Sequence, residues 1–178
     1  ANDAVFGVTP PPTGTKLRDL CQSIAYCSDK ILHFFFLAGP DFVMGPDADY
    51  SVRNVIGIAQ ANPDLGKKVI HARYLGTQML NIASGKAIHP VTAVPGGFSK
   101  PLTEAERDEL VPMAEEMLEF AKFAIEFAKN DIFPKYLDAI NTIGIIETGF
   151  LGTVTDDGSL DLYDGKARLM KPDGTYEE

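Results

Sequence analysis

The sequence has little positive charge, few cysteines and no long hydrophobic run, and each of these absences argues against a class of protein. Its 178 residues include 25 Asp and Glu against 16 Lys and Arg, which gives a net charge of -9. Nucleic-acid binding relies on clustered Lys and Arg, so we expect no nucleic-acid partner. A membrane-spanning helix needs roughly 20 apolar residues, and Gly39, Pro40 and Asp41 interrupt the longest candidate, residues 31–43. We therefore expect a soluble protein without a membrane span.

The two cysteines, Cys21 and Cys27, lie six residues apart in a predicted helix. This spacing places them on largely opposite faces, which excludes a local disulfide and a C-x-x-C metal clip. The sequence also contains no H-x-x-x-H or H-E-x-x-H pattern, so it carries no recognisable set of metal ligands. Unpaired cysteines are natural in a reducing cytoplasm, which is the location we expect.

Common phosphate-binding and hydrolytic motifs are also missing. Gly96 and Gly97 belong to neither a G-x-G-x-x-G motif nor a P-loop, so we interpret them as a tight turn. No serine lies in a G-x-S-x-G context, which leaves a hydrolase without support. The chain starts at Ala1 without a signal-peptide pattern and stops at Glu178 without a terminating element, so we expect a piece of a longer chain.

Apolar residues recur with the period of a helix in three long stretches, which predicts a helical bundle. Asn62, Pro63 and Asp64 form a helix start, because Asn caps free N–H groups and Pro fits the first turn. Thr103 and Glu106 form a capping box at the start of another helix. The predicted helices span residues 15–37 (ended by Gly39 and Pro40), 47–61 (a weaker pattern), 62–84 (ended by Gly85) and 103–129.

The remaining segments carry the turn-forming residues of loops and hairpins. Three consecutive prolines predict an extended lead-in over residues 1–13. Three prolines and three glycines in residues 85–101 predict an ordered loop or a short strand. From Leu151 onward, short β-prone runs alternate with Asp-Gly pairs, which predicts two or three antiparallel strands. The expected fold is mainly α, with a helical core segment over residues 1–150 and a β-hairpin insertion over residues 151–178.

A polar stripe runs along one face of the first long predicted helix. Gln22, Tyr26, Asp29 and His33 follow one another at spacings of four, three and four residues, so their side chains share a face. One interpretation is a solvent-facing side with an Asp29–His33 pair worth about 0.3 kcal/mol. The other is a functional pair, because the apolar run at residues 34–37 would surround His33 and give the pair perturbed pKa values.

The other two histidines carry weaker indications. His89 precedes Pro90 in the glycine-rich loop, where a structural hydrogen bond to a carbonyl is the plain interpretation. His71 lies in the middle of a predicted helix, near Lys68 and Arg73, and we expect it on the surface or at a contact with a partner. Neither histidine belongs to a metal-binding pattern. Composition and spacing alone therefore indicate an acidic, mostly helical, cytosolic domain.

Three segments share their residues and spacing with a known family. The segments are Val8-Thr9-Pro10-Pro11 through Lys16-Leu17-Arg18-Asp19-Leu20, residues 28–42 (SDKILHFFFLAGPDF) and residues 85–97 (GKAIHPVTAVPGG). Together they resemble the large subunits of nickel-iron hydrogenases, most of all the cytosolic multimeric group of NAD-, F420- or methyl-viologen-reducing enzymes. The third segment is the most specific of the three. The resemblance spans most of residues 4–140.

The resemblance implies a nickel-iron centre and reversible oxidation of H2 in the intact protein. In this family four cysteine thiolates bind the nickel, and two of them bridge to an iron that carries CO and cyanide. One cysteine pair, Arg-x-Cys-Gly-x-Cys, lies before the matching region, and the other, Asp-Pro-Cys-x-x-Cys, lies near the far C-terminus. Cys21 and Cys27 match neither pair. The resemblance therefore implies a scaffold segment without metal ligands, inactive on its own.

The resemblance also implies roles for single residues. Asp29 matches an aspartate above the open nickel-iron position, an outer-shell group that orients water or an arginine and assists proton movement. His33 matches the family's histidine four residues later, whereas Lys30 stands where many relatives have histidine. The residues implied to shape the loop packing beside the site, a structural role, are His89, Pro95, Gly96 and Gly97.

The implied partners are diaphorase-like electron-transfer subunits and an iron-sulfur small subunit, with H2 as substrate. A rival interpretation is the related quinone-site subunit of respiratory complex I, which keeps the fold without the metal. The segments around Asp29 and His89 favour the hydrogenase over this rival. A third interpretation is a pure subunit-interaction domain, whose apolar helix faces pack on other parts of the protein or on the small subunit. It predicts exposed apolar patches and self-association of the fragment.

Overall fold

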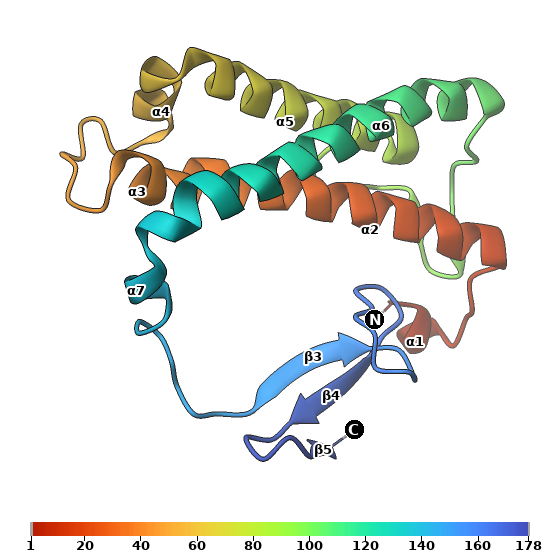
Figure 1. The fold of residues 1–178 in the computed structure, drawn as a ribbon. Coiled ribbons are helices and arrows are strands. Elements are labelled where there is room, and N and C mark those ends of the chain that lie inside the picture. The colour runs from red at the N-terminus through yellow and green to blue at the C-terminus, as the bar shows by residue number, and fades with distance from the viewer. Residues whose placement is uncertain (1, 178) are drawn as a thin grey trace. The chain divides into compact units, whose positions relative to one another are not determined.

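The computed structural model describes residues 2–177 and contains long helices followed by a small sheet (Figure 1). The expected mainly α fold with antiparallel strands at the C-terminal end is confirmed. None of the helices within residues 2–177 is both long and apolar enough to cross a membrane. In chain order the elements are α1 (Asn2–Phe6), α2 (Pro12–Leu32), the π-helical turn η1 (His33–Ala38), α3 (Gly39–Met44), α4 (Val55–Ala61), α5 (Pro63–Ser84), β1 (Ala93–Val94), β2 (Gly97–Phe98), α6 (Glu104–Phe127), the π-helical turn η2 (Ala128–Ile132), the short 3-10 helix η3 (Phe133–Lys135), α7 (Leu137–Ile140), β3 (Phe150–Val154), β4 (Lys166–Met170) and β5 (Tyr176–Glu177).

The chain forms two compact units, the first ending at Ile132 and the second beginning at Phe133. The first unit holds the long helices and the β1–β2 hairpin. The second holds η3, α7 and the strands β3 to β5. The change in character expected after residue 150 falls at the start of β3, whose first residue is Phe150. As a domain boundary, residue 150 stays a prediction.

Three long helices form the core of the first unit. α5 runs antiparallel to both α2 and α6 and packs against each of them, and the short α4 also packs on α5 (Figure 1). Small residues on α5, such as Ala72, Gly76 and Ala83, are buried and let its neighbours approach closely. Burial of apolar side chains here is the main stabilising term. The buried core residues are Cys21, Ile24, Ile31, Phe35, Ile58, Leu65, Val69, Ala72, Leu75, Met79, Leu80, Ala83, Leu110, Met117 and Phe120.

The predicted start and end of α5 and the predicted start of α6 are confirmed by their capping contacts. The Asn62 side chain accepts a hydrogen bond from the Leu65 N–H at 3.1 Å, and Gly85 ends α5 with a left-handed φ of 71°. Thr103 and Glu106 form the predicted capping box at the start of α6. Each contact satisfies backbone groups that the end of a helix would otherwise leave unpaired.

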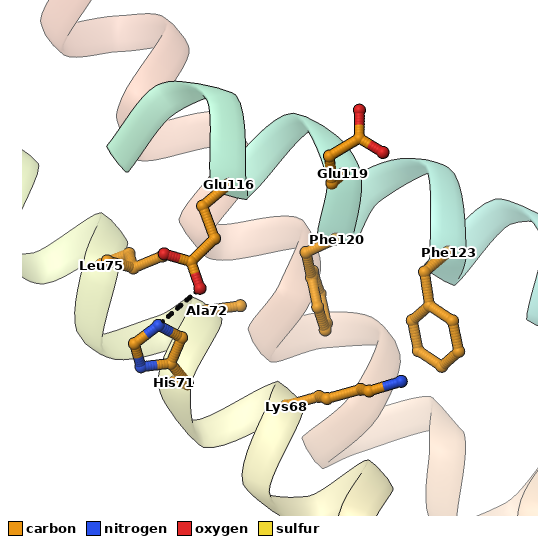
Figure 2. Close-up of a pocket in the computed structure, with 8 residues that line it drawn as sticks. All are labelled: Lys68, His71, Ala72, Leu75, Glu116, Glu119, Phe120 and Phe123. Carbon is orange, nitrogen blue, oxygen red and sulfur yellow. Dashed lines mark hydrogen bonds and ion pairs between the residues drawn. The ribbon is translucent and has the colours of Figure 1, made fainter. Parts of the chain in front are cut away.

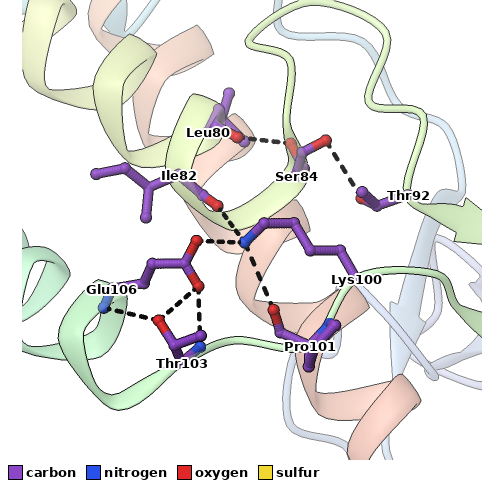
Figure 3. A network of polar contacts seen from close by, with 8 residues as sticks. All are labelled: Leu80, Ile82, Ser84, Thr92, Lys100, Pro101, Thr103 and Glu106. Carbon is purple, nitrogen blue, oxygen red and sulfur yellow. Dashed lines mark hydrogen bonds and ion pairs between the residues drawn. The ribbon is translucent and has the colours of Figure 1, made fainter.

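Lys100 connects this capping box to the end of α5 (Figure 3). Its Nζ donates to the Ile82 carbonyl oxygen at 3.0 Å and to Glu106 Oε1 at 2.6 Å. These contacts, with the Lys100 bond as the largest cause and the Thr103 N–H next, lower the pKa of Glu106 to about 2. The loop between α5 and α6 is therefore held at both ends by one charged side chain.

The first residues form a helix instead of the extended lead-in that the prolines predict. α1 precedes the prolines, and Asp3 in its first turn suits the positive end of the helix dipole. Residues 8–11 are the part that has no regular structure. The prediction for residues 1–13 was wrong because a helix this short shows no apolar periodicity. Ala1 lies outside the described residues.

The weak helix predicted over residues 47–61 begins only at Val55. Asn54 accepts hydrogen bonds from the Ile56 and Gly57 N–H groups, each at 3.0 Å, and so caps a helix start at this point. The residues before Asn54 form turns and bends. The β-branched residues that weakened the pattern thus fall partly outside the helix.

The first long helix does not end at Gly39 and Pro40, as predicted. It passes through η1 and continues as α3 to Met44. A π-helical turn bonds residue i to residue i+5, and the Gly39 N–H accordingly bonds the Phe34 carbonyl. Pro40, which has no N–H, lies in the first turn of α3, where none is needed. A Cβ at Gly39 would lie 2.7 Å from the Phe34 carbonyl oxygen, so the turn requires glycine.

Both predicted β regions are present. Residues 85–101 contain the β1–β2 hairpin, whose Pro95-Gly96 turn has a φ of 79° at Gly96, typical of a type II turn. In the second unit, β3, β4 and β5 form an antiparallel sheet in that order. Gly158 and Gly174 have φ values of 87° and 82°, the left-handed backbone typical of Asp-Gly turns.

Replacing Gly39 with alanine should destabilise the protein, because the new Cβ would clash with the Phe34 carbonyl oxygen. We expect Gly39→Ala to lower the free energy of unfolding by about 1–3 kcal/mol. The measurement is urea denaturation followed by circular dichroism. Gly152→Ala is the control, since no atom lies within 4 Å of the Cβ that it would add. Unchanged stability of Gly39→Ala would contradict the requirement for glycine.

Candidate functional site

The predicted polar stripe contributes exposed side chains to the outer face of α2. Asp29 and His33 lie one helical turn apart and are both exposed, and the Asp29 side chain keeps 63% of its accessible surface. Lys30 Nζ lies 3.5 Å from the Asp29 carboxylate, an exposed ion pair that contributes little stability. In the aromatic run that follows, Phe35 is the buried ring, and it packs against Phe120. Asp29 and His33 are thus accessible to a ligand or to another part of the protein.

Behind this stripe, Arg73 of α5 binds the residue that precedes Asp29. Its Nη1 donates to the carbonyl oxygen and to the Oγ of Ser28, each at 2.6 Å. Ser28 is buried, and a Cβ at Gly76 would lie 2.8 Å from its Oγ. The close approach of α2 and α5 at this level therefore depends on glycine.

The position of Arg73 on α5 is a signal that sequence reasoning missed. Val69, Gly76 and Leu80 lie four residues before it and three and seven residues after it, and all three are buried. Residues at these spacings share one face of a helix, so Arg73 places a charge on the buried stripe of α5. Such a charge needs a partner. The identity of that partner was not predictable, because Ser28 lies 45 residues away in the chain.

The β1–β2 turn is clasped by an ion pair at the start of α2. The Arg18 guanidinium donates to the Val94 carbonyl at 2.6 Å and to the Gly97 carbonyl at 2.9 Å. It also pairs with Asp3 at 2.5 Å, and Asp3 accepts a hydrogen bond from the Gly96 N–H at 2.7 Å. These contacts, above all the bond from Arg18, lower the pKa of Asp3 to about 2. The clasp thereby joins α1, α2 and the hairpin.

The hairpin turn meets α2 at a different level from Asp29. Arg18, which binds the turn, precedes Asp29 by eleven residues, or about 16 Å along a helix axis. His89 and Pro95 are exposed, and His89 has a φ of 54°, a left-handed conformation that is uncommon for a residue other than glycine. The structure therefore brings the turn to Arg18 and not to Asp29. The structural role of His89 and the turn beside a site stays a prediction.

A groove between α5 and α6 was not expected from the sequence (Figure 2). His71 Nε2 lies 2.8 Å from Glu116 Oε1, which bridges the two helices, and both side chains are exposed, so His71 lies on the surface as expected. Lys68 Nζ lies 4.5 Å from the centre of the Phe123 ring, close enough for a cation–π contact. The groove has a volume of about 240 Å³ and is lined by Lys68, His71, Ala72, Leu75, Glu116, Glu119, Phe120 and Phe123.

The described part of the chain does not supply a metal site. Within residues 2–177, no group of three or more His, Cys, Asp or Glu side chains is placed to hold an ion. Cys21 is buried, Cys27 is exposed, and both are free, as their spacing predicted. Burial raises the pKa of the Cys21 thiol, which disfavours the thiolate that binds metals. These residues do not fit a nickel-iron centre.

The Asp3–Arg18 clasp should make the stability of the first unit depend on acidity. The pKa of Asp3 falls from its ordinary value of 3.8 to about 2 in the folded protein. Ionised Asp3 therefore stabilises the fold fully above about pH 4, and this contribution is lost as the pH falls towards 2. We expect Asp3→Asn to lower the melting temperature at pH 6 and to flatten its decline between pH 4 and pH 2. Circular dichroism at stepped pH measures both effects.

Glu106→Gln gives a matched comparison, because Glu106 has a pKa of about 2 through a separate contact with Lys100. Since the two contacts share no residue, the two losses should add in the double variant. An Asp3→Asn protein that keeps the acid dependence of the unmodified protein would contradict the role assigned to the clasp.

No protein-family profile matches the chain, but individual relatives match it over nearly its whole length. A vhu subunit of the F420-non-reducing hydrogenase of Methanocaldococcus jannaschii is 45% identical over 174 residues, which are 98% of this chain and 41% of that subunit. The beta subunit of the NAD-reducing hydrogenase HoxS of Cupriavidus necator is 30% identical over 173 residues, which are 94% of this chain and 35% of that subunit.

A solved structure has the same fold. The crystal structure of an NAD+-reducing NiFe-hydrogenase in the H2-reduced state matches with a TM-score of 0.92 at 35% identity, covering 100% of this chain and 40% of that one. The chain thus spans about two fifths of the length of these relatives. The resemblance carried by the three sequence segments is confirmed, and the chain is a homologue of part of the large subunit of nickel-iron hydrogenases.

Proposed function

We propose that the complete protein is the large subunit of a nickel-iron hydrogenase that catalyses the reversible oxidation of H2. The observation that carries this proposal is 45% identity to a hydrogenase subunit over 98% of the chain. The TM-score of 0.92 to an NAD+-reducing NiFe-hydrogenase supports it independently. The names of these relatives favour a hydrogenase over the quinone-site subunit of complex I.

Within the complete protein, this chain serves as scaffold and wall of the site. The thiolates of the nickel-iron centre then come from residues outside these 178. Supporting this division of roles, Cys21 is buried in the core and Cys27 points away from it, and no ligand cluster exists within residues 2–177. The long helices α2, α5 and α6 provide the rigid support that precise positioning of a reaction centre requires.

Asp29 and His33 act as outer-shell groups in proton movement. Oxidation of one H2 releases two electrons and two protons, and the protons must leave through groups that can accept and release them. Both side chains are exposed on the same face of α2, one turn apart, so each can exchange protons with water or with a neighbouring group. The exposed ion pair with Lys30 leaves most of the Asp29 carboxylate accessible.

The electrons pass to an iron-sulfur small subunit, then to diaphorase-like subunits in the cytoplasm. The name of the Cupriavidus necator relative, an NAD-reducing hydrogenase, supports an acceptor of this kind, while the archaeal relatives are named F420-non-reducing. Val111, Leu118 and Ile125 are exposed at seven-residue intervals, so they form an apolar stripe on α6. This stripe supports packing on another part of the protein, and in the isolated chain it favours self-association.

Asp29→Asn in the complete subunit, within the complex that it forms with its partner subunits, tests the proposed role. We expect at least a tenfold loss of H2-dependent dye reduction, because general acid–base groups typically contribute about 10²-fold or more. An artificial one-electron dye is used so that the result does not depend on the physiological acceptor. Nickel and iron contents should remain those of the unmodified complex, since Asp29 is not a ligand.

Asp19→Asn is the matched control, because Asp19 is an exposed aspartate on the same helix but outside the polar stripe. It should keep full activity. A complex that contains nickel and iron but shows no H2 uptake would refute the hydrogenase proposal. Full activity of Asp29→Asn would instead remove Asp29 from the proton route and leave the hydrogenase proposal intact.

A further inference from the structure

Arg73 holds α2 at the turn that carries Asp29. Its Nη1 donates to both the backbone carbonyl oxygen and the hydroxyl oxygen of Ser28, each at 2.6 Å. Hydrogen bonds from a charged donor are roughly twice as strong as neutral ones. Because one bond goes to the backbone and one to the side chain of the same residue, together they oppose sliding of α2 along α5 and rotation of α2 about its axis.

This contact lies where α2 and α5 approach each other closely. Ser28 is only 6% exposed, and Gly76, one turn after Arg73, has no room for a Cβ because Ser28 Oγ would lie 2.8 Å away. Partial burial limits competition from water and so strengthens the bonds from Arg73. The buried stripe of α5 thus uses its charged residue to hold one residue of α2.

Fixing Ser28 also fixes the direction of Asp29. Successive residues of an α-helix are about 100° apart, so a Ser28 that faces α5 turns the Asp29 side chain towards the exposed face. On the other side of Asp29, η1 begins at His33, whose N–H is shared between the carbonyls of Asp29 and Lys30. A helix that changes here from α to π bonding supports Asp29 less firmly from that side. The orientation of Asp29 therefore depends on the contact from Arg73.

We propose that Arg73 is a positioning residue for Asp29: by binding Ser28, it keeps the Asp29 carboxylate in the orientation needed for proton transfer. This inference rests on the role proposed above for Asp29. Arg73 itself exchanges no proton and acts only through the backbone of α2. Its loss should consequently matter only while the Asp29 carboxylate is present.

The test uses the complete subunit in the complex with its partner subunits and compares Arg73→Gln with the unmodified complex. We expect kcat for H2-dependent dye reduction to fall about tenfold, with KM for H2 and nickel content unchanged, because misplacement of a reacting group slows the turnover step. In an Asp29→Asn background the same substitution should cause no further loss, since no carboxylate remains to be misplaced. Arg73→Lys should recover part of kcat, because an ammonium group can still donate to the Ser28 carbonyl.

Arg107→Gln is the control, since Arg107 is exposed and pairs with Asp108 on α6. It should keep the kcat of the unmodified complex. If Arg73→Gln does not assemble, Arg73→Lys carries the same comparison between the two backgrounds. Losses that multiply when the Arg73 and Asp29 substitutions are combined would overturn the inference and leave Arg73 as a stabilising contact alone. An unmodified, metal-loaded complex without H2 uptake would instead overturn the proposed function, so the two failures are distinguishable.

Discussion

The rest of the first unit depends on the burial of α5 between α2, α4 and α6. Apolar residues such as Val69 and Leu75 remove surface from water, and Gly76 lets α2 come close enough for direct contact with Ser28. Because α5 has neighbours on several sides, it determines which face of each surrounding helix is turned inward. The outer face of α2, with its polar side chains, follows from that choice. Arg73 adds direction to a contact that apolar packing alone would leave free to slide.

The features that sequence reasoning predicted correctly are those with short-range causes. The start at Asn62, the end at Gly85 and the capping box of Thr103 and Glu106 each depend on residues within one turn of one another. The shared face of Asp29 and His33 likewise follows from helical periodicity alone. The family could be identified because three segments kept their order and spacing, and this supplied the functional interpretation that periodicity could not.

The features that were missed depend on contacts between distant parts of the chain. Asp3 binds Gly96, which is 93 residues away, and this pairing supports a first helix too short to show a pattern. Arg73 reaches Ser28 across 45 residues. The continuation of the first helix through Gly39 was missed for another reason, because the rule that glycine and proline end a helix assumes α-helical bonding. The role of the site beyond these residues depends on parts of the protein that the chain does not include.

The turn η1 also affects how the chain can change in length. A π-helical turn holds one residue more than an α-helical turn in the same span. Deleting one residue between His33 and Ala38 would let regular α-helical bonding return and would rotate α3 by about 100° relative to α2. The residues before the turn would keep their packing on α5. A single-residue insertion or deletion here is therefore a simple evolutionary route for re-aiming the segment beyond Asp29 without disturbing the helix that carries it.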